Sequence, residues 1–249
     1  VVAGMKLAQM IEDGTITAEN AKIGYVGAFP FAEVISGFTS FFLGARSQCP
    51  SVTMEVRYTN SWGDMALEKE TAEALIADGC VLISQHADTT GAPSACEAAG
   101  VPCVGYNISM LPVAPNTALT SAAGDWGAYV TYAVKCLIDG EEIARDWCKG
   151  YAEGAVYTTE LNDSIVAPGT AEKVAELEEA FKAGTVKVFD TSTFTVNGET
   201  VTTYLADVDD LGDYVGETEA ISDGVFLESY YRSAPYFDLD IDGITNLDA

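Results

Sequence analysis

Basic residues are scarce in this chain of 249 residues. Lysine and arginine together number 12 against 38 aspartates and glutamates, which gives a formal net charge of -26. Such a negative field repels phosphate backbones and anionic lipid headgroups, so it argues against nucleic-acid binding and against a polybasic membrane anchor. Histidine occurs once, as His86, without a Cys, Glu or second His at ligand spacing, which argues against a metal site.

Cysteines are also few, and they are scattered. The six positions are 49, 80, 96, 103, 136 and 148, and no two of them form a Cys-x-x-Cys pair. A disulfide-built fold and a zinc site are therefore not expected. Cys80 and Cys103 each stand at the start of a predicted strand, so a cross-strand disulfide and two buried thiols both remain open.

Long apolar runs are missing. The most apolar stretch, residues 23–45, contains Pro30, Glu33 and several glycines, and it falls short of the roughly 20 apolar residues of a membrane helix. No charged segment followed by an apolar segment precedes Val1, so we expect any export signal to have been removed or to lie upstream.

Two short motifs match known sites incompletely. Gly24-Tyr-Val-Gly27 follows a predicted strand but lacks the spacing of a dinucleotide-binding loop. Asp238, Asp240, Asp242 and Gly243 match the first half of a calcium-binding EF-hand loop, yet position twelve is Ala249 instead of the bidentate Glu. A solvated acidic turn is the favoured interpretation, and no metal or other cofactor is expected.

What the chain does contain is an alternation of strand and helix patterns, with 48% apolar residues to build a core or two lobes. This alternation predicts an α/β fold with a parallel, doubly wound sheet. The predicted strands cover residues 22–26, 52–58, 81–84, 103–106 and 118–121, and the predicted helices cover 31–47, 65–77, 92–99 and 126–137.

The pattern changes beyond about residue 150. We expect a helix that is capped by Thr170 and ends at Gly184, then a strand over 186–189. Asn197-Gly198 predicts a tight turn between two hairpin strands at 193–196 and 199–202. Residues 207–249 are expected to form loops and short helices packed on the sheet, and residues 2–11 show a helical pattern.

Aromatic, imidazole, amide and carboxylate side chains follow the predicted strands, where an open parallel sheet presents its binding crevice. We take seven of them as candidate ligand-binding residues: Phe29, Trp62, His86, Asp88, Tyr106, Asn107 and Trp126. Structural roles compete with this interpretation. Trp62 and Trp126 also suit core packing, Tyr106 and Asn107 suit a turn, and His86 suits a structural loop contact.

An ordered series of segments resembles the basic membrane protein family of ABC-transporter substrate-binding lipoproteins, the group similar to purine nucleoside receptors. The matching segments are Lys22-Ile-Gly-Tyr-Val-Gly-Ala-Phe, Glu33-Val-Ile-Ser-Gly-Phe, Gly44-Ala-Arg, Trp62-Gly-Asp, Leu75-Ile-Ala-Asp-Gly-Cys-Val-Leu-Ile-Ser-Gln-His, Gly105-Tyr-Asn, Leu119-Thr-Ser, Asp125-Trp-Gly, Phe226-Leu-Glu-Ser and Ser233-Ala-Pro-Tyr-Phe. They run in family order over about the first 140 residues, and the last two resemble a family C-terminus.

The resemblance implies a type I periplasmic-binding-protein-like fold with two lobes, of which the first lobe is largely missing from this chain. Residues 1–21 would end that first lobe, 22–125 would form the ligand-binding lobe, and 126–249 would provide a crossover helix, a hairpin and C-terminal segments packed on both lobes. It also implies an extracytoplasmic, membrane-anchored lipoprotein without catalytic activity. Its partners would be a purine nucleoside or base, an ABC permease and the missing first-lobe segment.

Three positions depart from the family pattern. Asn107 and Ser109 stand where the family often has Asp, and Gly124 stands where it often has Lys. These departures favour a nucleobase or another small ligand over one bound through its ribose. Two further functions remain open, namely an enzyme that uses His86 and Asp88 as an acid/base pair, and a ligand sensor of the same fold.

Overall fold

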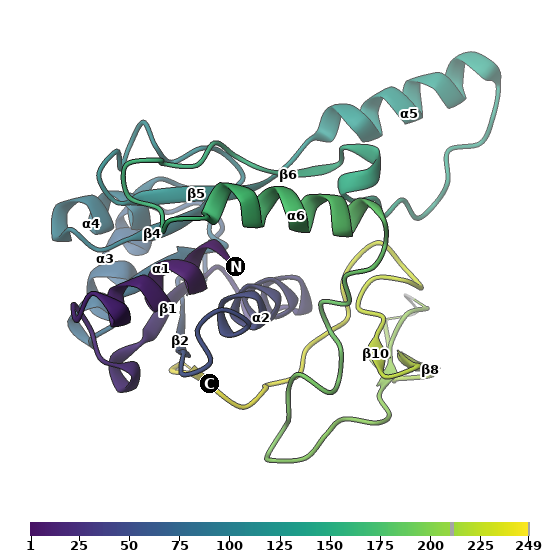
Figure 1. Ribbon diagram of the computed structural model, residues 1–249. Helices are drawn as coiled ribbons and strands as arrows, with labels where there is room; N and C mark the ends of the chain where they lie inside the picture. Colours follow the sequence, from purple (N-terminus) through teal and green to yellow (C-terminus); the bar gives the residue numbers. More distant parts are fainter. Residues whose placement is uncertain (210–211, 249) are drawn as a thin grey trace.

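The computed structural model describes residues 1–209 and 212–248 and is built around a mixed sheet (Figure 1). Within these residues the sheet has seven strands in the order β11-β2-β1-β3-β4-β5-β6, parallel except for the β5–β6 pair. The strands are β1 Lys22–Gly27, β2 Thr53–Tyr58, β3 Leu82–Gln85, β4 Cys103–Tyr106, β5 Ala118–Gly124, β6 Val156–Thr158 and β11 Ile244–Asn246.

Helices cover both faces of the sheet. The helices α1 (Val2–Glu12), α2 (Ala32–Arg46) and α6 (Thr170–Lys182) lie on one face, while α3 (Met65–Ala77) and α4 (Gly91–Ala99) lie on the other. The side chains of β1 point alternately to these two layers, since Ile23 and Tyr25 pack with α2 and Val26 packs with α3 and α4. A strand buried on both faces is typical of a doubly wound α/β fold.

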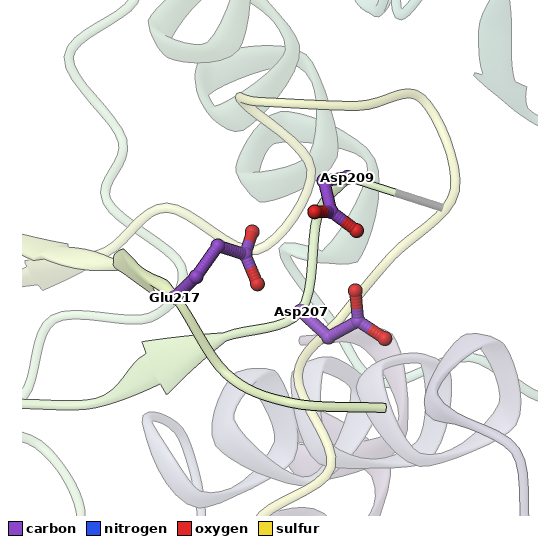
Figure 2. Close-up of side chains that lie close together, drawn as sticks. All are labelled: Asp207, Asp209 and Glu217. Atoms are coloured by element: carbon purple, nitrogen blue, oxygen red, sulfur yellow. The ribbon is translucent and has the colours of Figure 1, made fainter. Parts of the chain in front are cut away.

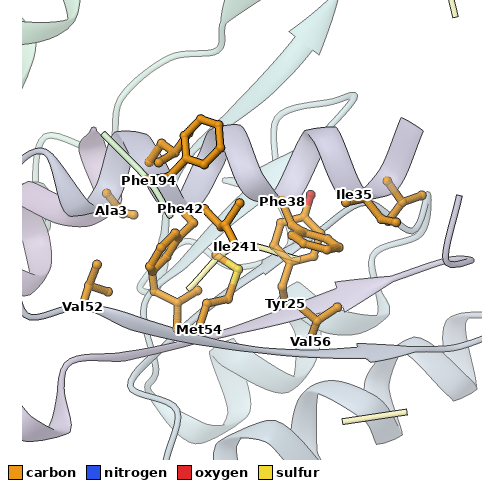
Figure 3. Close-up of a cluster of buried hydrophobic side chains, with 14 of the residues drawn as sticks. Ala3, Tyr25, Ile35, Phe38, Phe42, Val52, Met54, Val56, Phe194 and Ile241 are labelled. Carbon is orange, nitrogen blue, oxygen red and sulfur yellow. The ribbon is translucent and has the colours of Figure 1, made fainter. Parts of the chain in front are cut away.

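The larger core lies under α2 (Figure 3). Phe38 and Phe42 of α2 are fully buried against Tyr25 of β1 and Met54 of β2, and the ring centroids of Tyr25 and Phe38 are 5.7 Å apart. Phe194 and Ile241, from far along the chain, close this cluster. The C-terminal half therefore contributes to the core that supports β1 and β2.

The helix ends follow from local chemistry. The Asp64 carboxylate accepts hydrogen bonds from the backbone N–H groups of Ala66 and Leu67, at 3.0 and 3.1 Å, so it caps α3. Gly100 and Gly140 end α4 and α5 (Trp126–Asp139) in the left-handed conformation, with φ of 70° and 71°. The predicted fold class is confirmed, and the expected helices and strands up to residue 139 match the structure within a few residues.

Beyond residue 150 several expectations were wrong. Residues 186–189 form no strand, because the buried Phe189 packs on Phe237 with ring centroids 4.7 Å apart, and its carbonyl accepts from Phe226 N. Thr170 does not cap α6. Its hydroxyl donates to Ala167 O, and Gly169 holds the N-cap position.

The expected hairpin is reduced to its turn. Asn197 and Gly198 have φ of 53° and 81°, and Val196 pairs with Glu199 in a single bridge. The flanking strands do not form, because Thr195 O accepts from the N–H of Asp242 and the Asp242 carboxylate accepts from the N–H of Gly198. The Asp242 carboxylate therefore fixes the turn at residues 197–198.

Residues 207–249 were expected to form loops and short helices, but the described part of this segment contains short strands. Two small antiparallel ladders join β7 (Leu205–Ala206) with β8 (Thr218–Glu219), and β9 (Ile221–Ser222) with β10 (Val225–Phe226). The strand β11 then joins the main sheet beside β2. The expectation for residues 210, 211 and 249 lies outside the described residues.

The helix α5 extends away from the rest of the chain (Figure 1). On one side of it, Tyr129 and Tyr132 contact Trp147, with ring centroids 5.3 and 6.1 Å apart. The side chains on its other side are exposed, although most are large and apolar: Trp126, Val130, Val134, Leu137 and Ile138. These five residues are called the α5 stripe below. In the ranges that the structure describes, no helix has the length and apolar character that crossing a bilayer requires.

Candidate functional site

The order of the strands places a crevice at one end of β1. The chain passes from β1 outward to β2 on one side and then returns to β3 on the other side, so the loops that follow β1 and β3 diverge. Ligands of open α/β sheets bind at such a switch point, outside the carboxyl ends of the strands. Here these two loops carry Phe29 and His86.

Aromatic rings gather at this point. Phe29 and Phe31 are stacked, with centroids 5.1 Å apart and planes 13° apart, and the Trp62 ring lies 5.5 Å from Phe29. His86 joins them, with its ring centroid 6.4 Å from that of Trp62 and 4.4 Å from that of Tyr106. Phe31 was not among the expected residues, although an aromatic two positions after Phe29, on the other side of Pro30, was a readable signal.

His86 is buried, with only 6% of its surface exposed. Its Nδ1 lies 3.5 Å from the Tyr25 hydroxyl, while Nε2 has no hydrogen-bond partner among the described residues and lies 4.0 Å from Oε1 of Glu33. Burial lowers the pKa of His86 to about 4, so the imidazole is neutral at neutral pH. A neutral ring offers one donor and one acceptor, which suits a polar, uncharged ligand.

Hydrogen bonds join three of the strand-end loops. Asp88 N donates to Trp62 O at 2.8 Å, and Asn107 Nδ2 donates to the Asp88 carboxylate at 2.8 Å. Asn107 has a φ of 65°, which Asn tolerates better than most residues. The bond leaves Oδ2 of Asp88 and Oδ1 of Asn107 for other partners, so acceptors stand beside the aromatic rings.

The structure thus brings together six of the seven expected residues and leaves Trp126 apart. Trp126 begins α5 with 78% of its surface exposed, and it makes no ring contact within the described ranges. His86 and Asp88 are not hydrogen-bonded to each other, since His86 faces Tyr25 and Asp88 faces Asn107. The two side chains that the enzyme alternative pairs therefore have different partners in this structure.

A cavity of about 840 Å³ adjoins the same residues, between α2 and α6. Its volume lies in the range of roughly 300–1,000 Å³ that small-molecule sites occupy. Its lining includes Tyr25, His86 and Tyr106, apolar side chains such as Phe41, Leu177 and Phe181, and polar or charged side chains such as Arg46, Gln85 and Lys187. Of the candidate residues on the strand-end loops, only His86 and Tyr106 also line this cavity. The loop surface is the better candidate, because the stacked aromatic rings and the hydrogen-bonded side chains of Asp88 and Asn107 lie together there.

A cluster of carboxylates lies elsewhere (Figure 2). Ligand atoms of Asp207, Asp209 and Glu217 lie within 4.8 Å of one another, but Asp209 and Glu217 are exposed. Glu217 already accepts from Val208 N and from the Thr218 hydroxyl. An exposed acidic group of this kind is common without an ion, so it supports no metal centre. All six cysteines are free thiols, which excludes the Cys80–Cys103 disulfide in this structure.

Comparison with known proteins agrees with the sequence resemblance. Residues 14–189 match the family described as ABC transporter substrate-binding protein PnrA-like. The chain belongs to this family. A purine-binding protein of Brucella abortus is 34% identical over 180 residues, which cover 71% of this chain and 51% of that protein. A putative ABC transporter glucose-binding protein of Haloferax volcanii is 34% identical over 181 residues, which cover 73% of this chain and 46% of that protein.

The fold agrees as well. A solute-binding protein of an ABC transporter system from Aeropyrum pernix superposes with a TM-score of 0.59 at 19% sequence identity, covering 74% of this chain and 60% of that one. The family membership and the type I periplasmic-binding fold are therefore established. The chain spans about half the length of the curated relatives that it matches.

Proposed function

We propose that this chain is the ligand-binding lobe of an extracytoplasmic receptor that delivers a neutral purine base or nucleoside to an ABC permease. The receptor would close a second lobe over the ligand by a hinge motion. The observation that carries the proposal is the group of aromatic rings at the switch point, where Phe29 and Phe31 pack on Trp62 and the Trp62 ring lies beside that of His86. Flat heteroaromatic ligands stack on such rings.

The polar groups support a purine in particular. A purine edge carries both donors and acceptors, and the site presents the Asp88 carboxylate, the Asn107 carbonyl and a neutral imidazole beside the rings. The Brucella relative is named for purine binding. Asn107 and Ser109 stand where the family often has Asp. This difference favours recognition of the purine base over recognition of the ribose.

The charge of the loops supports a ligand without phosphate. The strand-end segments 28–33, 59–64, 86–90, 107–111 and 122–126 contain no Lys or Arg, whereas they contain Glu33, Asp64, Asp88 and Asp125. A phosphate group would meet only like charges there, which costs several kcal/mol. Nucleotides are therefore expected to bind far more weakly than nucleosides.

The α5 stripe is the surface that we assign to the second lobe. Its large apolar side chains follow one another at helical spacing, and surfaces of this kind are typical of interfaces. The stripe begins at Trp126, which also follows the sheet strand β5. Trp126 would then belong to the boundary between lobes. The lipoprotein anchor and the permease partner remain part of this proposal through the family.

A sugar is the second candidate ligand, because the Haloferax relative is named for glucose binding and aromatic rings also stack on sugar faces. Calorimetric titration of the two-lobed protein, unfolded and refolded to remove any bound ligand, separates the candidates. We expect adenosine or hypoxanthine to bind, adenosine monophosphate to bind at least about 100-fold more weakly, and glucose to give no heat. Glucose binding without purine binding would replace the proposal. The purine should be recovered chemically unchanged.

A further inference from the structure

Glu68, on the first turns of α3, is a buried charged residue with no surface exposed. Its carboxylate accepts three hydrogen bonds, all from Thr89: the backbone N–H bonds to both oxygens at 3.1 and 3.2 Å, and the hydroxyl bonds to Oε2 at 2.7 Å. No Lys or Arg in the described ranges lies within salt-bridge distance of it. Burial raises the pKa of Glu68, because removing the carboxylate from water disfavours its charged form.

Thr89 lies in the loop between β3 and α4 and is bonded to both ends of that loop. Its hydroxyl also accepts from Gly91 N at 3.1 Å, and Gln85 Nε2 donates to the carbonyls of Ala87 and Thr89 at 2.6 and 2.8 Å. Gly91 makes this approach possible, because a Cβ there would lie 2.4 Å from Met65 O and 2.9 Å from Glu68 Cβ. The loop that carries His86 and Asp88 is thus fixed at both of its ends.

The same helix fixes the neighbouring loop. The N-cap Asp64 lies two residues after Trp62, so Glu68 is about one turn of helix away from the Trp62 loop. Asp88 N then donates to Trp62 O, and the Asp88 carboxylate receives Asn107 Nδ2. A continuous series of hydrogen bonds and chain connections therefore runs from Trp62 through α3 and Thr89 to Asp88 and Asn107.

We infer that Glu68 is a positioning residue for the ligand site: through Thr89 it sets how far the His86–Asp88 loop stands from the Trp62 ring. This inference rests on the proposed site but does not depend on which ligand it takes. An apolar side chain would fill the same space without a desolvated charge. The carboxylate supplies what an apolar group cannot, since it accepts the backbone N–H and the hydroxyl of one loop residue together.

The test compares Glu68→Gln with two changes at Thr89 and one matched control. Glu68→Gln keeps the shape but turns one acceptor into a donor that faces the Thr89 donors. Thr89→Val keeps the shape of the side chain but removes its hydroxyl. Thr89→Ser keeps the hydroxyl and removes only the methyl group. Glu97→Gln is the control, because the more exposed Glu97 carboxylate also accepts backbone and side-chain hydrogen bonds, from Asn116 and Thr117 just before β5 and away from the strand-end loops.

Two measurements are made on each variant. Titration of the two-lobed protein with adenosine gives the affinity, and amide hydrogen exchange of the 249-residue chain without ligand reports on the loops. We expect Glu68→Gln and Thr89→Val each to weaken adenosine about 10-fold to 100-fold. The double variant that carries both changes should bind adenosine as tightly as either single variant. The Thr89→Ser variant should bind adenosine like the unaltered protein. Amide hydrogen exchange at residues 86–90 and 61–63 should become faster in Glu68→Gln and Thr89→Val and stay unchanged in Thr89→Ser and Glu97→Gln.

The outcomes separate this inference from the proposed function. If adenosine fails to bind the unaltered protein but exchange quickens as described, the ligand class is wrong and the positioning role stands. If Glu68→Gln and Glu97→Gln lower both affinity and melting temperature to the same degree, the effect is one of general stability and the positioning role is overturned. Unchanged exchange at 61–63 in Glu68→Gln overturns it as well.

Discussion

Gly37 of α2 lies directly against the imidazole of His86. A Cβ at position 37 would come within 2.6 Å of Nδ1 and 2.8 Å of Cε1. The helix can approach the end of β3 this closely only because residue 37 has no side chain. This contact holds the ring between α2 and Tyr106, so the orientation of the single histidine is set by a glycine 49 positions earlier in the chain.

Gly37→Ala is therefore expected to displace His86 and to weaken adenosine binding by about 1 to 3 kcal/mol, the scale of an overpacked contact. Isothermal titration measures the loss. Gly150→Ala is the matched control, because a Cβ at Gly150 would have nothing within 4 Å. Equal affinity in both variants would show that the His86 ring takes no part in binding.

Trp62→Ala is expected to weaken purine binding by about 1 to 3 kcal/mol, the usual scale for stacking of a base on an aromatic ring. Trp147→Ala provides the comparison, since Trp147 stacks on Tyr132 of α5 and not on the site. It should change the free energy of unfolding without changing affinity. A Trp62→Ala protein that binds as tightly as the original would assign this ring to packing alone.

His86 should make stability depend on pH. Its pKa is about 4 in the folded protein and about 6.5 in an ordinary chain, so between these values the unfolded chain binds a proton that the folded one does not. The free energy of unfolding should therefore fall as the pH decreases from about 6.5 to about 4, by about 3 kcal/mol from this group.

Urea unfolding at a series of pH values tests this in the original protein and in His86→Gln. Other groups titrate in both proteins, so the difference between the two curves isolates the histidine. The difference should be flat above pH 7 and should change below it. Parallel curves down to pH 4 would mean that the imidazole is not held neutral.

The α5 stripe should make the 249-residue chain associate when it is studied alone. Replacing Leu137 and Ile138 by Lys is expected to reduce both self-association and the binding of an apolar dye, because these side chains are 71% and 78% exposed. Analytical ultracentrifugation measures the first effect. Lys135→Glu, on the same helix, should leave both unchanged. A monodisperse chain that binds no dye would remove the reason for assigning this face to a second lobe.

The first 139 residues could be predicted from sequence because their elements are decided locally. The strand at 103–106 and the helix at 65–77 were predicted with the bounds that the structure has. The apolar residues at 186–189 gave an equally good strand pattern, but packing of Phe189 on Phe237 decided their conformation. The strand β11 was missed, because its pairing with β2 depends on contacts far along the chain.

The proximity of most candidate residues was predictable as well, although their binding role stays a prediction. Loops that follow parallel strands meet at one edge, so residues such as Phe29, His86 and Asn107 could be found from their positions alone. Trp126 could not be placed, since the direction in which α5 leaves the sheet is not encoded locally. Glu68 was overlooked because a Glu between Leu67 and Lys69 looks like part of a solvated helix face. Its burial follows from the close approach of α4 at Gly91.

The strand β11 has a consequence for synthesis of the protein. Tyr58 N bonds to the Asp248 carboxylate across 190 positions of sequence, so β2 leaves the ribosome long before its outer neighbour exists. At about 5 to 20 residues per second, that interval lasts roughly 10 to 40 s. During this time the outer edge of β2 is unpaired, and such an edge is a template for strands of other nascent chains. The yield of folded protein in cells should therefore rise when holdase chaperones are abundant and when the protein is expressed slowly.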